Sequence, residues 1–263
     1  MSCVLMAAET GADITEDAVL GGRLRLRQLS QGHRVGHDAI LLAAACPVRA
    51  GEHAADLGAG VGAAGLALAR RVEGAHITLV EMDARLAALA GENAALNRLS
   101  ARVNVAEVDV MADARALASA GLHPHSFMRV LMNPPFNDPA RQRTSPDGRR
   151  RLAHAGARGT LRAWVAAAAQ LLRPSGTLSL IWRADRLEEA LQALHDLFGA
   201  TTLLPIHPKP EQAAIRVLVR ATRGSHAPLH LLPGFVLADE TGRASAAAEA
   251  VLRQGAVLPL AQV

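Results

Sequence analysis

The sequence predicts an α/β fold in which a mostly parallel sheet is covered by helices on both faces. Three observations support this prediction. Apolar strand-like segments alternate with alanine- and leucine-rich helical segments, a glycine-rich turn follows the first core strand, and a short link containing Pro208 and Pro210 separates the last two strands. Strands that alternate with helices pair in parallel through right-handed crossovers. The short link instead favours an antiparallel hairpin at the end of the sheet.

Each expected element follows from local composition, because strands are short apolar runs and helices are longer runs rich in alanine and leucine. The expected strands are 53–57, 77–81, 103–108, 127–132, 177–182, 201–206 and 214–220. The expected helices are 62–71, 84–99, 112–120, 159–172 and 186–198. No internal repeat or second core is evident, so we expect one domain over residues 1–263.

Two flanks are expected around a core of residues 48–221. The N-terminal flank, 1–47, contains the alternating segment 23–27, which predicts a strand with one wet face, and then a helix over 38–45 with Asp38 as its N-cap. The C-terminal extension, 222–263, is expected to hold a last short helix at 244–253. Residues 137–157 form a long expected loop, and loops of that length in a compact domain are usually functional or mobile.

The composition excludes several classes of protein. Half of the 263 residues are hydrophobic and 20% are charged, which excludes a disordered chain. The longest uncharged apolar run, about 39–48, is far shorter than the ~20 residues that span a bilayer, and the N-terminus does not resemble a secretory signal. Cys3 and Cys46 lie outside any C-x-x-C motif, which excludes a disulfide framework. We therefore expect a cytoplasmic protein with no membrane partner.

Two arginine-rich segments each carry a local charge of +4, which equals the formal net charge of the whole chain. Residues 18–37 contain four arginines and no acid, and residues 137–158 contain six arginines against two aspartates. Lys209 is the only lysine, a bias that also fits a GC-rich coding sequence. Clustered guanidinium groups suit phosphate binding, so these segments indicate an RNA partner.

A glycine-rich turn, Asp56-Leu57-Gly58-Ala59-Gly60-Val61-Gly62, ends the first core strand and opens a helix. Glycines allow a tight turn and a close backbone approach to a ligand. Glu81 and Asp109 end the next two strands at the same carboxyl edge, and a carboxylate there can accept hydrogen bonds from both ribose hydroxyls. Asp56 would repel a pyrophosphate, but it suits the cationic amino and sulfonium end of S-adenosylmethionine.

This turn resembles motif I of the class I S-adenosylmethionine-dependent methyltransferases, and the resemblance covers roughly residues 52–220. It implies a Rossmann-like, seven-stranded, mostly parallel sheet with an antiparallel last strand, and S-adenosylmethionine as the cofactor. The alternative is an ordinary glycine turn in a Rossmann-like protein of another purpose.

The segment Asn133-Pro134-Pro135-Phe136 follows the fourth strand, so it is expected at the same edge as the glycine turn. Two prolines stiffen the backbone and remove two N–H donors. The Asn133 amide oxygen and the Pro134 carbonyl then provide two acceptors for a planar –NH2 group, while Phe136 can stack on its ring. The segment resembles the (N/D)-P-P-(Y/F/W) signature of methyltransferases that act on amino groups. Taken alone, it could also be a rigid strand-ending turn.

Residues 31–44 resemble the "G-x-R-x-G-x-D-A-x-L-L-A" stretch of the bacterial tRNA(valine) adenine N6-methyltransferases, which modify the adenine next to the anticodon. The resemblance implies that Gly36, His37 and Asp38 line the cofactor pocket. One departure is that many relatives carry a tyrosine and a further aromatic where this chain reads Phe136-Asn137. The expected cofactor-binding residues are Gly36, His37, Asp38, Asp56, Gly58, Ala59, Gly60, Gly62, Glu81, Met82, Asp109, Val110 and Asn133.

The expected RNA contacts are the two arginine-rich segments. A base flipped into the site needs its backbone held nearby, and the second segment directly follows Phe136. The alternatives are a solvated loop for the second segment and, for the first, an edge strand whose charges discourage aggregation. The predicted RNA-binding residues are Arg141, Arg143, Arg149, Arg150, Arg151, Arg23, Arg25 and Arg27.

Other acceptors remain open: guanine N2 of rRNA, which shares the Asn-Pro-Pro-Phe segment, and protein glutamine, which Phe136 and the basic loop disfavour. A degenerate methyltransferase fold that only binds RNA is a further alternative, against which Asp56, Glu81 and Asn133 argue. No metal is expected, because no acid or cysteine accompanies His123-x-His125 at ligand spacing. Trp164 and Trp182 lie in apolar runs and are expected in the core.

Overall fold

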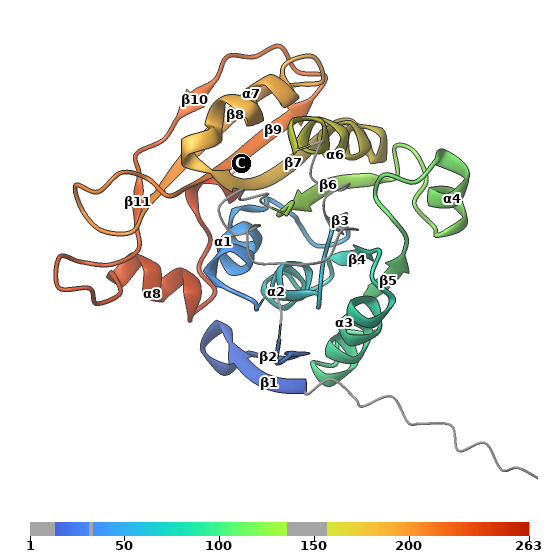
Figure 1. The fold of residues 1–263 in the computed structure, drawn as a ribbon, viewed down its shortest axis with the longest axis horizontal. Coiled ribbons are helices and arrows are strands. Elements are labelled where there is room, and N and C mark those ends of the chain that lie inside the picture. Colours follow the sequence, from blue (N-terminus) through green and yellow to red (C-terminus); the bar gives the residue numbers. More distant parts are fainter. Residues whose placement is uncertain (1–13, 32–33, 136–156, 263) are drawn as a thin grey trace, which may run out of the picture.

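The structure, a computed structural model, describes residues 14–31, 34–135 and 157–262, with the backbone alone over 157–160. One large sheet crosses the molecule in the order β5-β4-β3-β6-β7-β9-β8 (Figure 1). Its long strands are β3 (His53–Leu57), β4 (His76–Glu81), β5 (Val103–Glu107), β6 (Phe127–Met132), β7 (Leu172–Arg183), β8 (Phe198–His207) and β9 (Arg216–Arg223). The pairs on the β5 side are parallel, whereas β9 is antiparallel to both β7 and β8. The predicted α/β fold and the antiparallel last strand are therefore confirmed.

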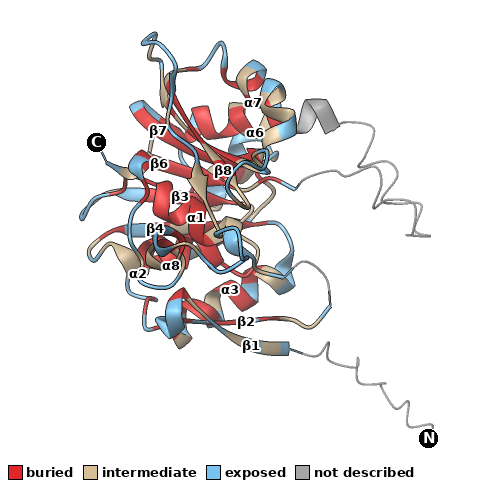
Figure 2. Ribbon diagram, turned by 90° about the vertical axis from the view of Figure 1, so that its left-hand side faces the viewer, coloured by how far each residue is buried: buried red, intermediate tan, exposed pale blue. Residues whose placement is uncertain are grey.

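Helices cover both faces of the sheet, and each face has its own hydrophobic cluster (Figure 2). Neighbouring strand residues alternate between the clusters: Leu79 and Leu131 face one, while Val80 and Met132 face the other. Each fully buried side chain of this size stabilises the fold by about 1.5–3 kcal/mol. The first cluster is covered by α1 (His37–Ala45), α2 (Ala63–Arg71), α3 (Ala84–Leu96) and α8 (Ala246–Leu252), and the second by α4 (Ala114–Ser119), α6 (Ala157–Leu171) and α7 (Leu187–Leu194). None of the helices in the described ranges is long and apolar enough to cross a bilayer.

The strand order reverses at β3, which pairs with β4 on one side and β6 on the other. In register, Leu57 of β3 lies opposite both Val80 of β4 and Met132 of β6. Such a reversal opens a crevice beyond the carboxyl ends of the strands. The residues that leave these three strands therefore emerge side by side at one edge; they are Gly58, Glu81 and Asn133.

The sheet is larger than the sequence predicts. Two short strands, β10 (His230–Leu231) and β11 (Phe235–Val236), pair in parallel with β8 and extend the sheet from seven strands to nine. β7 also begins at Leu172, ahead of the predicted start at residue 177. Strands of two residues show no alternating pattern, so periodicity could not find β10 and β11.

The N-terminal flank forms a separate antiparallel hairpin of β1 (Ile14–Val19) and β2 (Leu24–Leu29), which packs beside α3 (Figure 1). Two buried asparagines, Asn93 of α3 and Asn97 at its C-cap, take the place of a neighbouring strand. The Asn93 side chain accepts from the backbone N–H of Arg27 over 2.7 Å and donates to its carbonyl over 2.9 Å, and Asn97 does the same for Arg25 over 3.0 and 2.7 Å. Asn93 also donates to the carbonyl of Val61, so it links the hairpin to the glycine-rich turn.

Replacing Asn93 by alanine is expected to lower the free energy of unfolding by about 2–4 kcal/mol, because it leaves the buried carbonyl of Val61 and two part-buried backbone groups of Arg27 without partners. Urea unfolding would measure the change. Asn104→Ala, at an exposed position of β5, is the matched control and should change stability by less than about 0.5 kcal/mol. If both substitutions change the free energy of unfolding equally, the hydrogen bonds between Asn93 and the hairpin do not stabilise the fold.

Candidate active site

The glycine-rich turn is shaped by close contacts on both of its sides. The Gly60 N–H donates to Glu81 Oε2 over 2.8 Å, which fastens the turn to the end of β4. Gly58 has a φ of +68°, and a Cβ placed on it would lie 2.5 Å from Cη2 of Trp164 in α6. Glycine is therefore required at position 58 both by the left-handed backbone and by the indole ring that packs on it.

Gly58→Ala is expected to weaken S-adenosylmethionine binding by about 10-fold, because the left-handed backbone costs about 1–2 kcal/mol and the new methyl group displaces Trp164. Calorimetry would measure the affinity. Gly51→Ala is the control, since Gly51 also has a positive φ, +80°, but open space around its Cβ position. Trp164→Leu in the Gly58→Ala background should restore part of the affinity. No recovery would mean that contact with the ring is not the cause.

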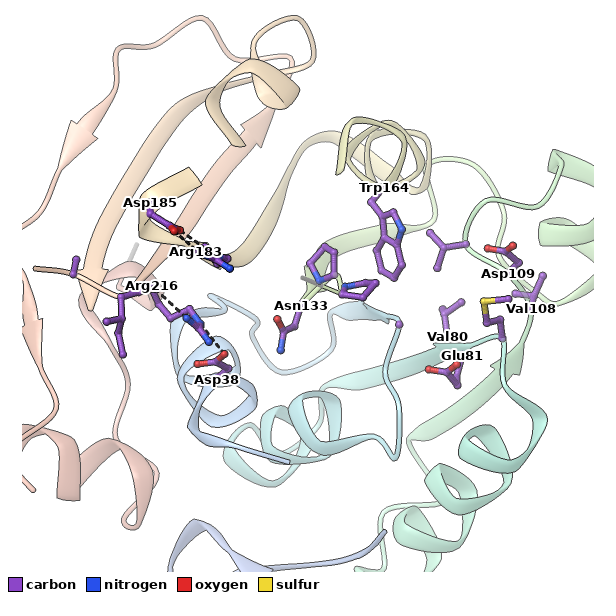
Figure 3. Close-up of a pocket in the computed structure, with 17 residues that line it drawn as sticks. Asp38, Val80, Glu81, Val108, Asp109, Asn133, Trp164, Arg183, Asp185 and Arg216 are labelled. Atoms are coloured by element: carbon purple, nitrogen blue, oxygen red, sulfur yellow. Dashed lines mark hydrogen bonds and ion pairs between the residues drawn. The ribbon is translucent and has the colours of Figure 1, made fainter. Parts of the chain in front are cut away.

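Two acids stand at the strand ends beyond the turn. Glu81 is 8% exposed, and its oxygens accept from the backbone N–H groups of Gly60 and Asp83 over 2.8 and 2.9 Å. Asp109 accepts from the N–H of Met111 over 2.8 Å. A carboxylate offers about four acceptor positions. These backbone bonds thus orient both carboxylates, which retain capacity for ligand donors on the same side of the cavity (Figure 3).

Asp56 lies behind the turn. Its buried Oδ2 accepts from the N–H of Gly65 in the first turn of α2 over 2.8 Å. Burial raises the pKa of Asp56 to about 7; the Gly65 hydrogen bond opposes this rise and the charge of Glu81 adds to it. Asp56 is not among the residues that line the cavity, and its hydrogen bond to Gly65 holds the first turn of α2 in place. Its direct contact with the cofactor stays a prediction.

A cavity of about 840 Å³ opens between the glycine-rich turn and the ends of β4, β5 and β6 (Figure 3). This volume lies within the ~300–1,000 Å³ that is usual for ligand sites. Apolar side chains line the cavity beside the two acids, and Met82 among them is 66% exposed. The lining residues that were predicted are Asp38, Gly58, Glu81, Met82, Asp109, Val110, Asn133, Pro134 and Pro135.

Asn133 lies midway along this cavity (Figure 3). Its Oδ1 atom is buried, and within the described residues it accepts no hydrogen bond. A buried acceptor without a partner costs about 1–3 kcal/mol, which a donor from a bound molecule would recover. The adjacent Pro134 and Pro135 have no N–H to offer, so this amide oxygen can accept from a ligand that brings its own donor.

Other predicted site residues lie elsewhere. Gly36 and His37 line a second cavity of about 800 Å³ beside the β1–β2 hairpin. Ala59, Gly60 and Gly62 belong to the turn but are not among the residues that line the first cavity. The remaining predicted residues lie outside the described ranges: Phe136, Arg141, Arg143, Arg149, Arg150 and Arg151.

One prediction about an individual residue was wrong. Gly36, not Asp38, is the N-cap of α1; Asp38 lies in the first turn, where its Oδ2 accepts from Nε of Arg216 over 2.9 Å. Trp164 packs against the second hydrophobic cluster, but it is only half-buried, because it also contacts Gly58 and lines the cavity. Trp182 is buried, as predicted.

Sequence reasoning missed the charged side chains at the far end of the cavity, which are Arg183, Asp185 and Arg216. A signal for them existed. Arg183 directly follows the predicted strand 177–182, at the carboxyl edge where ligands bind. Arg216 begins the antiparallel strand β9, whose first residue reaches the same edge because the strand runs in the opposite direction.

The three arginines at 23–27, of which Arg25 and Arg27 belong to β2, have partners in the structure. Arg25 pairs with Glu16 of β1, Arg27 lies 3.3 Å from Glu16 and from Glu92 of α3, and Arg23 donates to the carbonyl of Gln254. Arg25 and Arg27 project from the exposed face of the hairpin, while Leu24 and Leu26 are buried. Their assignment to RNA stays a prediction.

The described residues fit S-adenosylmethionine. All four of the following residues line the cavity: Glu81 would accept from the ribose hydroxyls, Asp109 would accept from the adenine amino group, and Met82 and Val110 would cover the purine. When bound, the cofactor supplies an electrophilic methyl group. Gly58 lines the same cavity as these acids and Asn133. The fold and the site together define a class I S-adenosylmethionine-dependent methyltransferase.

Comparison with known proteins agrees with this class. Residues 32–209 match the methyltransferase small domain family. A protein of Porphyromonas gingivalis (strain ATCC 33277), named tRNA1(Val) (adenine(37)-N6)-methyltransferase, is 31% identical over 201 residues, which cover 74% of this chain and 77% of the relative. An Erwinia tasmaniensis protein with the same name is 36% identical, but the match covers only 43% of this chain and 44% of that relative.

Among solved structures, a predicted O-methyltransferase from Agrobacterium tumefaciens is similar with a TM-score of 0.71 and 32% identity, covering 84% of this chain and 98% of that one. An S-adenosylmethionine-dependent O-methyltransferase from Thermotoga maritima shares the fold, with a TM-score of 0.52, 19% identity, and coverage of 75% and 68%. The chain belongs to the methyltransferase small domain family.

Proposed function

We propose that this protein transfers a methyl group from S-adenosylmethionine to the exocyclic N6 amine of an adenine in tRNA, beside the anticodon. The observation that carries the proposal is Asn133, a residue that lines the cavity and whose buried Oδ1 accepts no hydrogen bond from any described residue. Such an oxygen can accept from an N–H or O–H donor of a bound molecule.

The chemistry follows from the poor nucleophilicity of an aromatic amine, whose lone pair is delocalised into the ring. Asn133 Oδ1 and the Pro134 carbonyl would accept its two N–H groups and favour a tetrahedral nitrogen as positive charge develops on it. This is alignment and dipole stabilisation without a strong base, since a methylated amine loses its proton readily. Methyl transfer to a hydroxyl would instead require a group that removes a proton, and an amide cannot do this.

The acceptor is supported by the relatives. The P. gingivalis protein and a protein of Aeromonas hydrophila that is 32% identical over 201 residues carry the same name, which specifies adenine 37 of tRNA1(Val). A tRNA substrate would also explain the arginines at 141–151, which stay predicted RNA contacts, and would place the protein in the cytoplasm.

The test is incubation with radiolabelled S-adenosylmethionine and separated tRNA, rRNA and protein fractions, followed by nucleoside and amino-acid analysis. N6-methyladenosine in the tRNA fraction is the expected product. If the label appears in N2-methylguanosine of rRNA or in methylglutamine of protein, the acceptor is guanine N2 or a glutamine side chain and not adenine N6. A chain that binds no cofactor at millimolar concentration in calorimetry would be an RNA-binding module and not an enzyme.

A further inference from the structure

The cavity has two chemically different ends on either side of Asn133 (Figure 3). The end with Glu81 and Asp109 fits the cofactor nucleoside. The opposite end carries two guanidinium groups, from Arg183 and Arg216. We propose that Arg183 and Arg216 bind the phosphodiester backbone of the acceptor nucleic acid next to the methylated nucleotide, an inference that rests on the proposed function.

Both arginines are held in place by a carboxylate. Arg183 donates from Nε and Nη2 to the two oxygens of Asp185, over 2.9 and 2.5 Å, and Arg216 donates from Nε to Asp38 over 2.9 Å. The side chains of both arginines are 28% exposed. Arg216 also donates from Nη1 to the carbonyl of Ile215 over 3.0 Å. A guanidinium is planar and always charged, so these bonds fix the orientation of a positive charge at the cavity wall. The aspartates also offset the cost of keeping two positive charges in a partly desolvated wall.

The position of this pair suits the acceptor and not the donor. An adenine whose amine meets Asn133 from the side away from the cofactor carries its ribose and phosphates toward the remaining end of the cavity. Guanidinium groups there would bind phosphate oxygens through charge-assisted, bidentate hydrogen bonds. Ile215, which precedes Arg216, also lines this end, and its side chain is 45% exposed, so an apolar surface stands beside the charges for a sugar or a base.

A glutamine side chain and its backbone carry no anion, so a glutamine acceptor would bring no negative charge to Arg183 and Arg216. Of the two acceptor classes, the arginine pair therefore favours a nucleic acid. It also predicts that phosphates beside the target nucleotide, and not only distant ones, contribute to recognition.

The experiment uses a tRNA anticodon stem-loop and two copies in which a neutral methylphosphonate replaces one phosphate, either 5′ or 3′ to the acceptor adenine. Binding is followed by fluorescence anisotropy over a range of salt, and methyl transfer is followed in parallel. Arg183→Gln and Arg216→Gln are compared with Arg186→Gln, a control in the same turn whose side chain pairs with Glu189 at 3.0 Å and is not among the cavity residues. Arg216→Lys keeps the charge without the fork, in case loss of the ion pair with Asp38 unfolds the chain.

We expect each arginine variant to bind the unmodified RNA about 10-fold more weakly, with the slope of log affinity against log salt reduced by about 1. One methylphosphonate should weaken wild-type binding by a similar factor and should have no further effect in the matching variant. Cofactor affinity should stay within two-fold. Arg186→Gln should behave as wild type, and Arg216→Lys should lie between wild type and Arg216→Gln.

The inference is overturned if the losses in RNA affinity from the arginine variant and from the methylphosphonate are additive. It is also overturned if the salt slope of the variants is unchanged, or if they lose cofactor affinity while RNA affinity stays intact. The binding arm does not depend on turnover. If the wild-type protein binds the RNA but methylates no RNA, the proposed function fails, and the methylphosphonate comparison still decides whether these arginines contact the phosphates. Absence of RNA binding by the wild type would overturn both.

Discussion

Asn133→Ala is expected to lower kcat by about 100- to 1,000-fold while the affinity for S-adenosylmethionine changes by less than two-fold. Removing one preorganised dipole from the reacting centre typically has an effect of this size. In the proposed geometry the amide contacts only the acceptor amine, whereas Glu81 and Asp109, at the other end of the cavity, would hold the cofactor. Single-turnover kinetics and calorimetry would separate the two quantities.

The conservative variant sharpens this prediction. Asn133→Asp keeps an oxygen that can accept from the amine, so it should retain more activity than alanine at the same cofactor affinity. Asn104→Ala, at the exposed position of β5, controls for the loss of an asparagine elsewhere. Parallel losses in kcat and cofactor affinity would make Asn133 a cofactor-binding residue and would remove the chemical argument for an amino acceptor.

The framework of the site could be predicted because it depends on local signals. Strands β3, β4 and β6 are short apolar runs with clear ends, and parallel pairing brings those ends to one edge. That rule alone predicts that Gly58, Glu81 and Asn133 meet, as the structure shows.

What could not be predicted depends on side chains that meet across the fold. The use of Asn93 and Asn97 as a substitute strand edge leaves no periodic trace in the sequence, since buried asparagines on a helix resemble exposed ones. Trp164 lies in an apolar run, and only the rotation of α6 decides that it faces Gly58. The pairing of Asp38 with Arg216 joins residues 178 positions apart, which local patterns do not reveal.

Asp56→Asn is expected to remove a pH dependence of about 4 kcal/mol from the free energy of unfolding. In the folded protein, burial raises the pKa of Asp56 from 3.8 to about 7, so the folded state holds this proton more tightly than the unfolded chain. Stability from the protonated carboxyl is therefore fully present below pH 4 and is lost as the pH rises to about 7. A tenfold difference in proton affinity corresponds to about 1.4 kcal/mol, so the rise in pKa from 3.8 to about 7 corresponds to about 4 kcal/mol.

Urea unfolding of wild type and Asp56→Asn between pH 4.5 and 8 would test this. The asparagine oxygen can still accept from the N–H of Gly65, so the variant should keep the turn. It should gain stability relative to wild type as the pH rises. Glu107→Gln, which removes an exposed carboxylate from β5, provides the baseline. A constant difference between wild type and Asp56→Asn across this range would contradict the prediction.

The same variant separates two roles for Asp56. If the carboxylate acts from behind the turn, as its bond to Gly65 indicates, Asp56→Asn should change cofactor affinity by only a few fold, and to the same extent at pH 5.5 and pH 8. If it contacts the sulfonium or amino group directly, the loss should grow as the pH passes about 7, because only the ionised wild-type carboxylate attracts the cation. Calorimetry at the two pH values therefore distinguishes an indirect effect through the backbone of the turn from direct charge pairing with the cofactor.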